Sequence, residues 1–156
     1  MTNVEEDQSY PDHPDRFDVP QLLCREVLTG RCYWEVQWSG LVSVSVSYRR
    51  ISRKGDSDDC VLGRNDHSWS LDCYSGGQYS VLYNNRYTSI NSSSPSSVSD
   101  RVAVYVDVPA GTLSFYDVVS DRLIHLHTFN TTFSEPLCAG FGLWSMSESS
   151  VSLCPV

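Results

Sequence analysis

The 156-residue chain has no apolar run of the roughly 18 residues that a membrane-spanning helix needs. Its first residues, MTNVEEDQ, are acidic and include no apolar stretch, so they do not predict a secretion signal. A G-x-S-x-G motif and a C-x-x-C pair are also absent, which argues against a hydrolase nucleophile and a zinc site. We therefore expect no membrane contact for this domain, no catalysis, no metal or other cofactor, and no small-molecule substrate.

Basic residues are scarce. The chain has 11 Lys and Arg against 19 Asp and Glu, a net charge of −8, which disfavours a nucleic-acid partner because phosphate binding needs clustered cations. The exception is the mixed-charge run RRISRKGD at Arg49–Asp56. Such a run is usually a solvated loop, but it can also contact a partner protein. Arg53, Lys54 and Asp56 are our candidate contact residues in it.

Six cysteines leave two interpretations open, because an even count is compatible with disulfides. Cys32, Cys138 and Cys154 lie inside apolar strand patterns, where a free thiol behaves as a small hydrophobic side chain. Without a secretion signal, reduced thiols and a cytoplasmic location are the favoured prediction.

Alternating apolar and polar residues predict an all-β fold. The clearest case is Arg101–Val119, where four valines alternate before a Pro109-Ala110-Gly111 turn, and Leu113 and Phe115 continue the apolar face. Many short strands with turns between them are typical of an antiparallel β-sandwich. The other predicted strands are Arg31–Trp38, Val42–Tyr48, Ser68–Tyr74, Gln78–Tyr83, Leu123–Phe129, Leu137–Trp144 and Ser149–Cys154.

Serine is abundant in two segments. Val42–Tyr48 alternates Val and Tyr with three serines, which predicts a strand with one buried face and one polar face. Thr88–Ser99 is serine-rich and contains Pro95, so we predict an exposed loop. Residues 1–20 contain three prolines and are expected to form an extended lead-in, not a helix.

Three of the four tryptophans, Trp34, Trp38 and Trp69, follow the apolar periodicity and are predicted to lie in the core. Trp144 ends a predicted strand before the polar segment Ser145–Ser150. Two interpretations stay open for it: packing beneath that segment, or an exposed anchor, since Trp is common at binding hot spots.

His125 and His127 occupy alternate positions of a predicted strand, which would place both imidazoles on one face. A metal site needs a third ligand, and nothing nearby in the sequence supplies one. We favour packing histidines over metal ligands.

Several blocks of the chain resemble the PRY-SPRY domain family, in the order that the family shows. The fit looks closest to SPRY domains of fish TRIM-type ubiquitin ligases, NLR-type receptors and stonefish-type toxins. The blocks are LTGRCYWEV at Leu28–Val36, DHSWSL at Asp66–Leu71, the Val102–Tyr116 hairpin, PLCAGF at Pro136–Phe141 and VSLC at Val151–Cys154, with YPDHPDRF at Tyr10–Phe17 and ISRK at Ile51–Lys54.

The resemblance implies a bent antiparallel β-sandwich of the concanavalin-like jelly-roll type. It divides the chain into a partial PRY segment and lead-in over residues 1–27 and a SPRY sandwich over residues 28–156, as one structural unit. It implies a non-enzymatic module that recognises a partner protein through loops at one end. Such a domain would form the target-recognition part of a larger innate-immune or ubiquitin-ligase protein, which is cytoplasmic.

Partner contacts in TRIM-type relatives come from two places, the strand after the S-W block and the loop before the last strand. By alignment these places correspond to Asp72 and Tyr74, and to Trp144 and Ser145. The loop Ser52–Cys60, which holds the mixed-charge run, matches another variable loop. Two alternatives remain: a glycan-binding sandwich, and a structural or assembly domain of a pore-forming toxin subunit.

Overall fold

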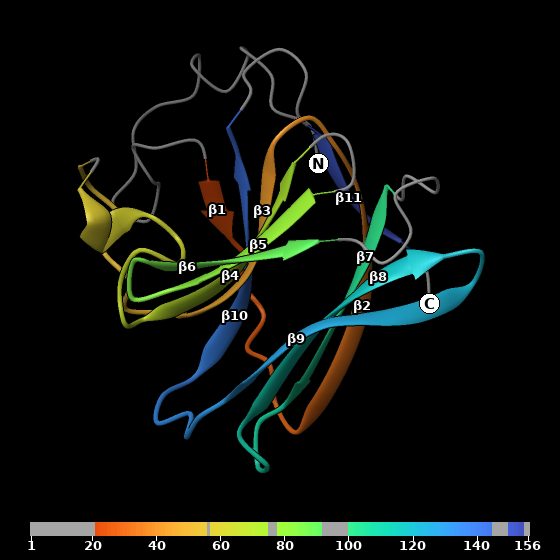
Figure 1. The fold of residues 1–156 in the computed structure, drawn as a ribbon. Helices are drawn as coiled ribbons and strands as arrows, with labels where there is room; N and C mark the ends of the chain where they lie inside the picture. Colours follow the sequence, from red (N-terminus) through yellow and green to blue (C-terminus); the bar gives the residue numbers. More distant parts are fainter. Residues whose placement is uncertain (1–20, 56, 75–77, 92–99, 145–149, 155–156) are drawn as a thin grey trace.

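The protein is a sandwich of two antiparallel β-sheets (Figure 1). The computed structural model describes residues 21–55, 57–74, 78–91, 100–144 and 150–154. In these residues the one helical element is a 3-10 turn at Asp58–Cys60, and no helix is long and apolar enough to cross a bilayer. The predicted all-β antiparallel sandwich is confirmed.

One sheet has six strands and the other has five. In spatial order, the six-stranded sheet contains β1 (Gln21–Leu23), β10 (Leu137–Leu143), β3 (Val42–Tyr48), β4 (Ser68–Tyr74), β5 (Gln78–Tyr83) and β6 (Arg86–Asn91). The five-stranded sheet contains β11 (Ser150–Cys154), β2 (Arg31–Ser39), β7 (Arg101–Asp107), β8 (Thr112–Val119) and β9 (Arg122–Asn130).

The hydrophobic core fills the space between the sheets. Alternate residues of each central strand point inward; Val44 on β3, Val104 on β7 and Phe115 on β8 are fully buried. Full burial of one such side chain contributes about 1.5–3 kcal/mol, so these inward positions dominate the stability of the fold. Trp38 and Trp69 lie in this core as predicted, whereas Trp34 is only partly buried against it.

The predicted turn between β7 and β8 is confirmed, and its glycine is required. Gly111 has φ +73°, and a Cβ there would lie 1.9 Å from the carbonyl oxygen of Thr131. The Gly111 N–H donates to the carbonyl of Asp107 at 2.9 Å, which closes the turn. A side chain at this position would therefore disturb both the turn and the segment after β9.

Strand prediction failed at both edges of the six-stranded sheet. Arg86–Asn91 forms edge strand β6, so the loop predicted over Thr88–Ser99 is wrong for its first four residues, and the rest of it lies outside the described residues. The backbone of this serine-containing segment pairs with β5, which needs no apolar side chain. At the other edge, β1 is a three-residue strand that no periodicity indicates; it pairs with β10.

The serines of β3 do not face solvent. Ser43, Ser45 and Ser47 lie on the outer face of the six-stranded sheet, away from the core, yet they are only 2%, 1% and 0% exposed. The predicted apolar and polar faces are both present, but the polar face is buried as well. Alternation correctly separates the two faces of the strand, but it carries no information about whether a further segment covers the outer one.

Part of that cover is the connection between β3 and β4, residues 49–55 and 57–67, which we call the cover segment. Its buried side chains Ile51 and Leu62 pack with the partly buried Leu23 of β1, outside the main core. The fit depends on small residues both in the sheet and in the cover segment. A Cβ on Gly140 would lie 3.2 Å from Leu62, and one on Gly63 would lie 2.9 Å from both Leu82 and Ser70.

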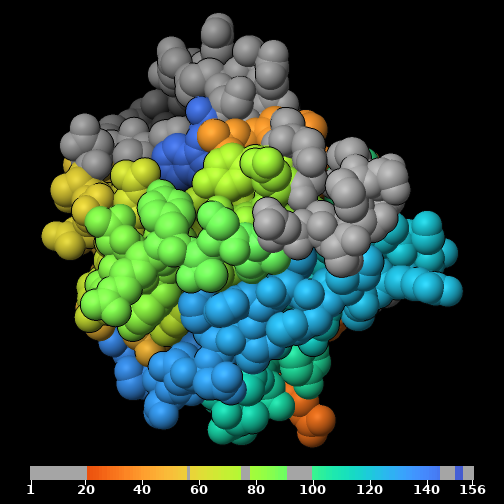
Figure 2. All heavy atoms as spheres, in the orientation of Figure 1, coloured from red at the N-terminus to blue at the C-terminus, as the bar shows by residue number. Residues whose placement is uncertain are grey.

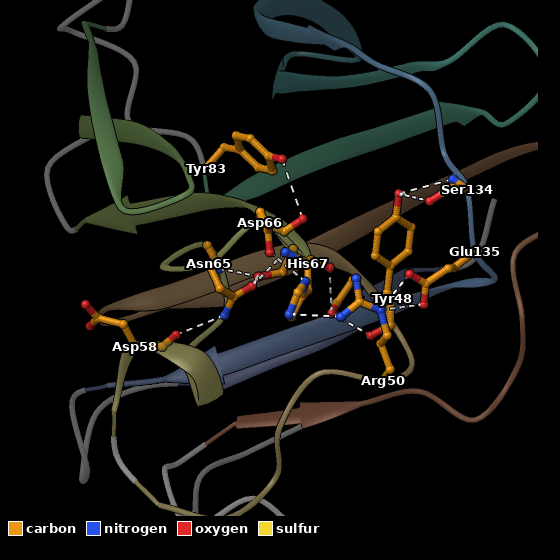
Figure 3. A network of polar contacts seen from close by, with 12 residues as sticks. Tyr48, Arg50, Asp58, Asn65, Asp66, His67, Tyr83, Ser134 and Glu135 are labelled. Carbon is orange, nitrogen blue, oxygen red and sulfur yellow. Dashed lines mark hydrogen bonds and ion pairs between the residues drawn. The ribbon is translucent and has the colours of Figure 1, made fainter.

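Polar contacts fasten the cover segment to the sandwich (Figure 3). The guanidinium of Arg50 bonds the carboxylate of Glu135, between β9 and β10, at 2.5–2.7 Å. His67 lies between Arg50, 3.1 Å from its Nε2, and Asp66, 2.7 Å from its Nδ1. Asn65 donates to the carbonyls of Asp58 and Val61 and so holds the cover segment in its folded shape.

A β-bulge separates the two histidines of β9. The register places His125 opposite Tyr116 and His127 opposite Phe115, which point to opposite faces of β8. Accordingly, the His125 ring contacts Tyr116, and the His127 ring lies 4.5 Å from Phe129, beside the core. The prediction that both imidazoles share a face is wrong, because a bulge inverts the alternation.

Figure 2 shows the turn between β8 and β9 projecting from the surface.

Candidate functional site

One row of the six-stranded sheet brings together three residues that the sequence nominates separately. At this end of the sheet β3 and β5 begin while β4 and β10 end. Neighbouring positions across these strands are Gly142, Ser43, Asp72 and Ser80, all on the outer face. Tyr74 lies two residues beyond Asp72 on the same face, and Trp144 lies two residues beyond Gly142. We call these six residues the Asp72 row.

Trp144 lies against the sheet and is held there. A Cβ on Gly142 would lie 2.8 Å from the indole ring, so the missing side chain makes room for Trp144. The indole Nε1–H donates to Ser43 Oγ at 2.7 Å, and the Trp144 backbone N–H donates to the carbonyl of Leu41 at 2.9 Å. Trp144 is half-buried: its ring packs on the sheet while part of the side chain stays accessible.

Asp72 is the end point of a chain of oriented hydrogen bonds. Ser43 Oγ–H donates to Asp72 Oδ1 at 2.7 Å, and Ser70 Oγ–H donates to the same oxygen at 3.0 Å. Ser45 in turn donates to Ser70 at 2.8 Å. Trp144 and Asp72 are thus linked through Ser43, so the position of each depends on the other.

The electrostatics of the row are dominated by desolvation. Burial raises the pKa of Asp72 above its ordinary value, although the Ser43 and Ser70 hydroxyls and the charge of Arg64 oppose the rise. Burial and the nearby Asp72 also raise the pKa of Tyr74, while a hydrogen bond with the Ser80 hydroxyl opposes that rise. A carboxylate in this setting gains from any further donor that approaches it.

The remaining candidates lie elsewhere or outside the described residues. Arg53 donates to the carbonyl of Arg49, and the carbonyl of Lys54 accepts from the Cys60 thiol, so their described contacts lie within the cover segment. The structure does not bring these two residues together with Asp72. Asp56 and Ser145 lie outside the described residues.

Sequence reasoning missed Ser43, Ser80 and Gly142. Each is a small residue whose role comes from its neighbours across the sheet, and the register is needed to see it. The one available signal is the Val-Ser alternation of β3, which predicts a polar face but not its neighbours across the sheet.

No metal site is present among the residues that the structure describes. No three His, Cys, Asp or Glu side chains lie close enough together there to hold a metal ion. On the outer face of the other sheet, Glu35 lies among tyrosines, but Tyr33 donates to one of its oxygens at 2.6 Å and Arg101 to the other at 3.3 Å. Its carboxylate is thus engaged within the protein.

Comparison with known proteins gives one consistent result. Residues 31–154 match the SPRY domain family model. Cytolytic toxin-beta of Scorpaena plumieri is 43% identical over 135 residues, which cover 86% of this chain and 19% of the toxin.

Two solved structures have the same fold. The stonustoxin structure superposes with a TM-score of 0.83 at 35% identity, covering 93% of this chain and 24% of the toxin chain. The crystal structure of the TRIM65 PSpry domain superposes with a TM-score of 0.79 at 25% identity, covering 92% of this chain and 73% of that one. The chain therefore spans only about a fifth of the toxin relative's length and most of the isolated PSpry domain.

Proposed function

Because the chain belongs to the SPRY domain family, we propose that it is a non-enzymatic module that binds a partner protein at the Asp72 row. SPRY domains are recognition modules and are not typically catalytic. The proposal rests above all on the convergence of Asp72, Tyr74 and Trp144, which lie on one face at one end of the sandwich.

The physical make-up of the row supports recognition of a protein surface. Aromatic side chains supply large contact areas with few rotatable bonds, and they dominate binding hot spots. Trp144 is already fixed by Ser43 and Gly142, so little conformational entropy is lost when a partner packs on it. Asp72, which already accepts a hydrogen bond from Ser43, is a fixed acceptor that can orient a donor of the partner.

We further propose that the chain is the target-recognition part of a larger cytoplasmic protein with a role in innate immunity or ubiquitin ligation, of TRIM-like or NLR-like organisation. The likeness to the TRIM65 PSpry domain supports this organisation. Cys24, Cys32, Cys60, Cys73 and Cys138 are free thiols, the form that reducing compartments maintain. Arg53, Lys54, Asp56 and Ser145 are further candidate partner contacts in this proposal.

A second function has an observation of its own. The likeness to cytolytic toxin-beta and to stonustoxin favours a structural or assembly domain within a toxin subunit. In that case the Asp72 row would contact another domain of the same assembly and not a separate target.

The test is a partner-binding measurement with variants on and off the row. A protein retained by the wild-type chain is identified, purified and titrated by calorimetry. We expect the double variant Tyr74→Ala/Trp144→Ala to weaken binding by at least about 100-fold, because it removes both aromatic anchors. Tyr105→Ala, on the outer face of the five-stranded sheet, is the matched control and should change the affinity less than about twofold.

Stability separates a lost contact from a lost fold. Trp144→Phe keeps a smaller ring on the sheet and removes the donor to Ser43, so its thermal unfolding serves as the reference. Equal weakening by the Tyr105 and Tyr74/Trp144 variants would place the binding surface elsewhere. If the only binding found is to other segments of the full-length protein, the assembly role is favoured instead.

A further inference from the structure

The direction of the hydrogen bonds in the Asp72 row indicates which type of side chain a partner places there. We propose that the partner inserts a basic side chain, an arginine or a lysine, against Asp72, between Trp144 and Tyr74. This inference rests on the proposed function, since it specifies the partner's chemistry at the same surface.

The first argument is the direction of the protons. The hydroxyl protons of Ser43 and Ser70 are both directed at Oδ1 of Asp72. The indole proton of Trp144 is used on Ser43, and the hydroxyl proton of Ser45 is used on Ser70. Every donor in this chain of contacts is therefore engaged inside the protein. What this chain of contacts offers outward is an acceptor, which suits a donor from the partner better than an acidic group.

The second argument is the unfilled oxygen. Asp72 Oδ2 accepts no hydrogen bond from any residue that the structure describes, while a carboxylate can accept about four. The positive charge of Arg64 lowers the pKa of Asp72, but the described ion pair of Arg64 is with Asp58, at 3.8 Å. Burial outweighs the serine hydroxyls and Arg64, so the pKa of Asp72 is raised and its anionic form is incompletely compensated. A charged donor would supply what is missing.

The third argument is the surroundings of the carboxylate. Ser43 and Ser80, its neighbours across the sheet, are short, and the same face carries the aromatic side chains of Tyr74 and Trp144. Aromatic faces attract Lys and especially Arg, whose planar guanidinium can stack on a ring while it bonds a carboxylate. The net charge of −8 also favours a basic partner at long range.

The test uses two short peptides as probes: Ac-Gly-Arg-Gly-NH2 and its citrulline counterpart, which has nearly the same shape and hydrogen-bond donors but no charge. Each is titrated into the protein while the indole N–H resonance of Trp144 is followed by NMR. We expect the arginine peptide to shift this resonance at millimolar concentration, and the citrulline peptide to bind about tenfold more weakly. Asp72→Asn should reduce the difference between the peptides to less than about twofold.

Asp100→Asn is the matched control, because Asp100 is an exposed acid on the other sheet that accepts from Gln37. It should leave the preference for arginine intact. Equal binding of both peptides to the wild-type protein, or no shift of the Trp144 resonance with either, would overturn the basic-side-chain inference. Neither result touches the proposed function, which is decided by the partner titration. Since the arginine–citrulline comparison is made on wild-type protein, an unfolded Asp72 variant would not remove the test.

Discussion

The backbones of the two sheets are shielded from solvent in different ways on their outer faces. On the six-stranded sheet the outward residues are mostly serine and glycine, and the cover segment packs over them with Leu62 and Gly63. On the five-stranded sheet the central outward residue Ala103 lies between Glu35 and Tyr116 and is also fully buried. There the long neighbouring side chains shield the backbone, and no further layer lies over them among the residues that the structure describes.

The difference teaches that side-chain size, more than polarity, determines whether a sheet face receives a cover. Serines hold the backbone of a covering segment close enough for direct contact, as Gly63 shows by donating its N–H to Ser68 at 2.7 Å. Tyrosines are too long to let a covering backbone approach, and their hydroxyls bond neighbouring side chains of the same face, as Tyr33 does by donating to Glu35. The partner surface that we propose lies where the serine-rich face passes beyond the cover segment.

The largest expected effect comes from loosening the cover. Leu62→Ala removes the side chain that packs over Gly140 and should destabilise the protein by about 2–4 kcal/mol, through lost burial and the cavity left behind. Denaturant unfolding monitored by tryptophan fluorescence measures the loss.

Leu123→Ala is the matched control on the other sheet. Leu123 is 49% exposed beside the β8–β9 turn, and its truncation should cost less than about 0.5 kcal/mol. Similar losses for the two leucines would mean that the cover segment contributes no core of its own, and the contrast between the two faces would fail.

An intermediate effect distinguishes the serines of the two faces. Ser70→Ala removes a fully buried hydroxyl that accepts from Ser45 and donates to Asp72, so two partners lose a bond. We expect a loss of about 1–2 kcal/mol in the free energy of unfolding. Ser114→Ala, on the five-stranded sheet, breaks one bond, to Thr128, and should cost about 0.5–1 kcal/mol. A larger loss at Ser114 would contradict the idea that the buried polar contacts of the covered face matter more.

Much of the fold could be predicted because alternation reports directly on the two faces of a strand. The bounds of β3, β4 and β5 are confirmed residue for residue, and each has a clear apolar set. The edge strands β1 and β6 could not be predicted, because they are held by backbone pairing that leaves little trace in side chains. The bulge on β9 inverts the alternation of His125 and His127 without any local sequence signal.

The candidate site was predictable only in part. Asp72, Tyr74 and Trp144 were nominated through family resemblance, and the register explains why residues 70 positions apart lie on one face. Ser43, which joins Trp144 to Asp72, could not be found without that register. Whether these residues bind a partner remains a prediction for the titration to decide.

The smallest effect concerns Tyr33, on the self-shielded face of the five-stranded sheet. Burial and the Glu35 carboxylate, which accepts its hydrogen bond, raise the pKa of Tyr33 from 10.0 to about 12. Its contribution to stability is therefore complete below pH 10.0 and is lost as the pH rises towards 12, since the unfolded chain releases the proton first. Near pH 7, Tyr33→Phe should lose this contribution and be less stable than the wild type, whereas above pH 10 the difference in their free energies of unfolding should shrink. In an alkaline titration followed by phenolate absorbance, Tyr33 gives a late component, near pH 12. This component should disappear in Tyr33→Phe and should move to lower pH in Glu35→Gln. A late component that survives Glu35→Gln unchanged would show that burial alone sets this pKa, and that outward tyrosines shield their sheet by packing without help from their hydroxyls.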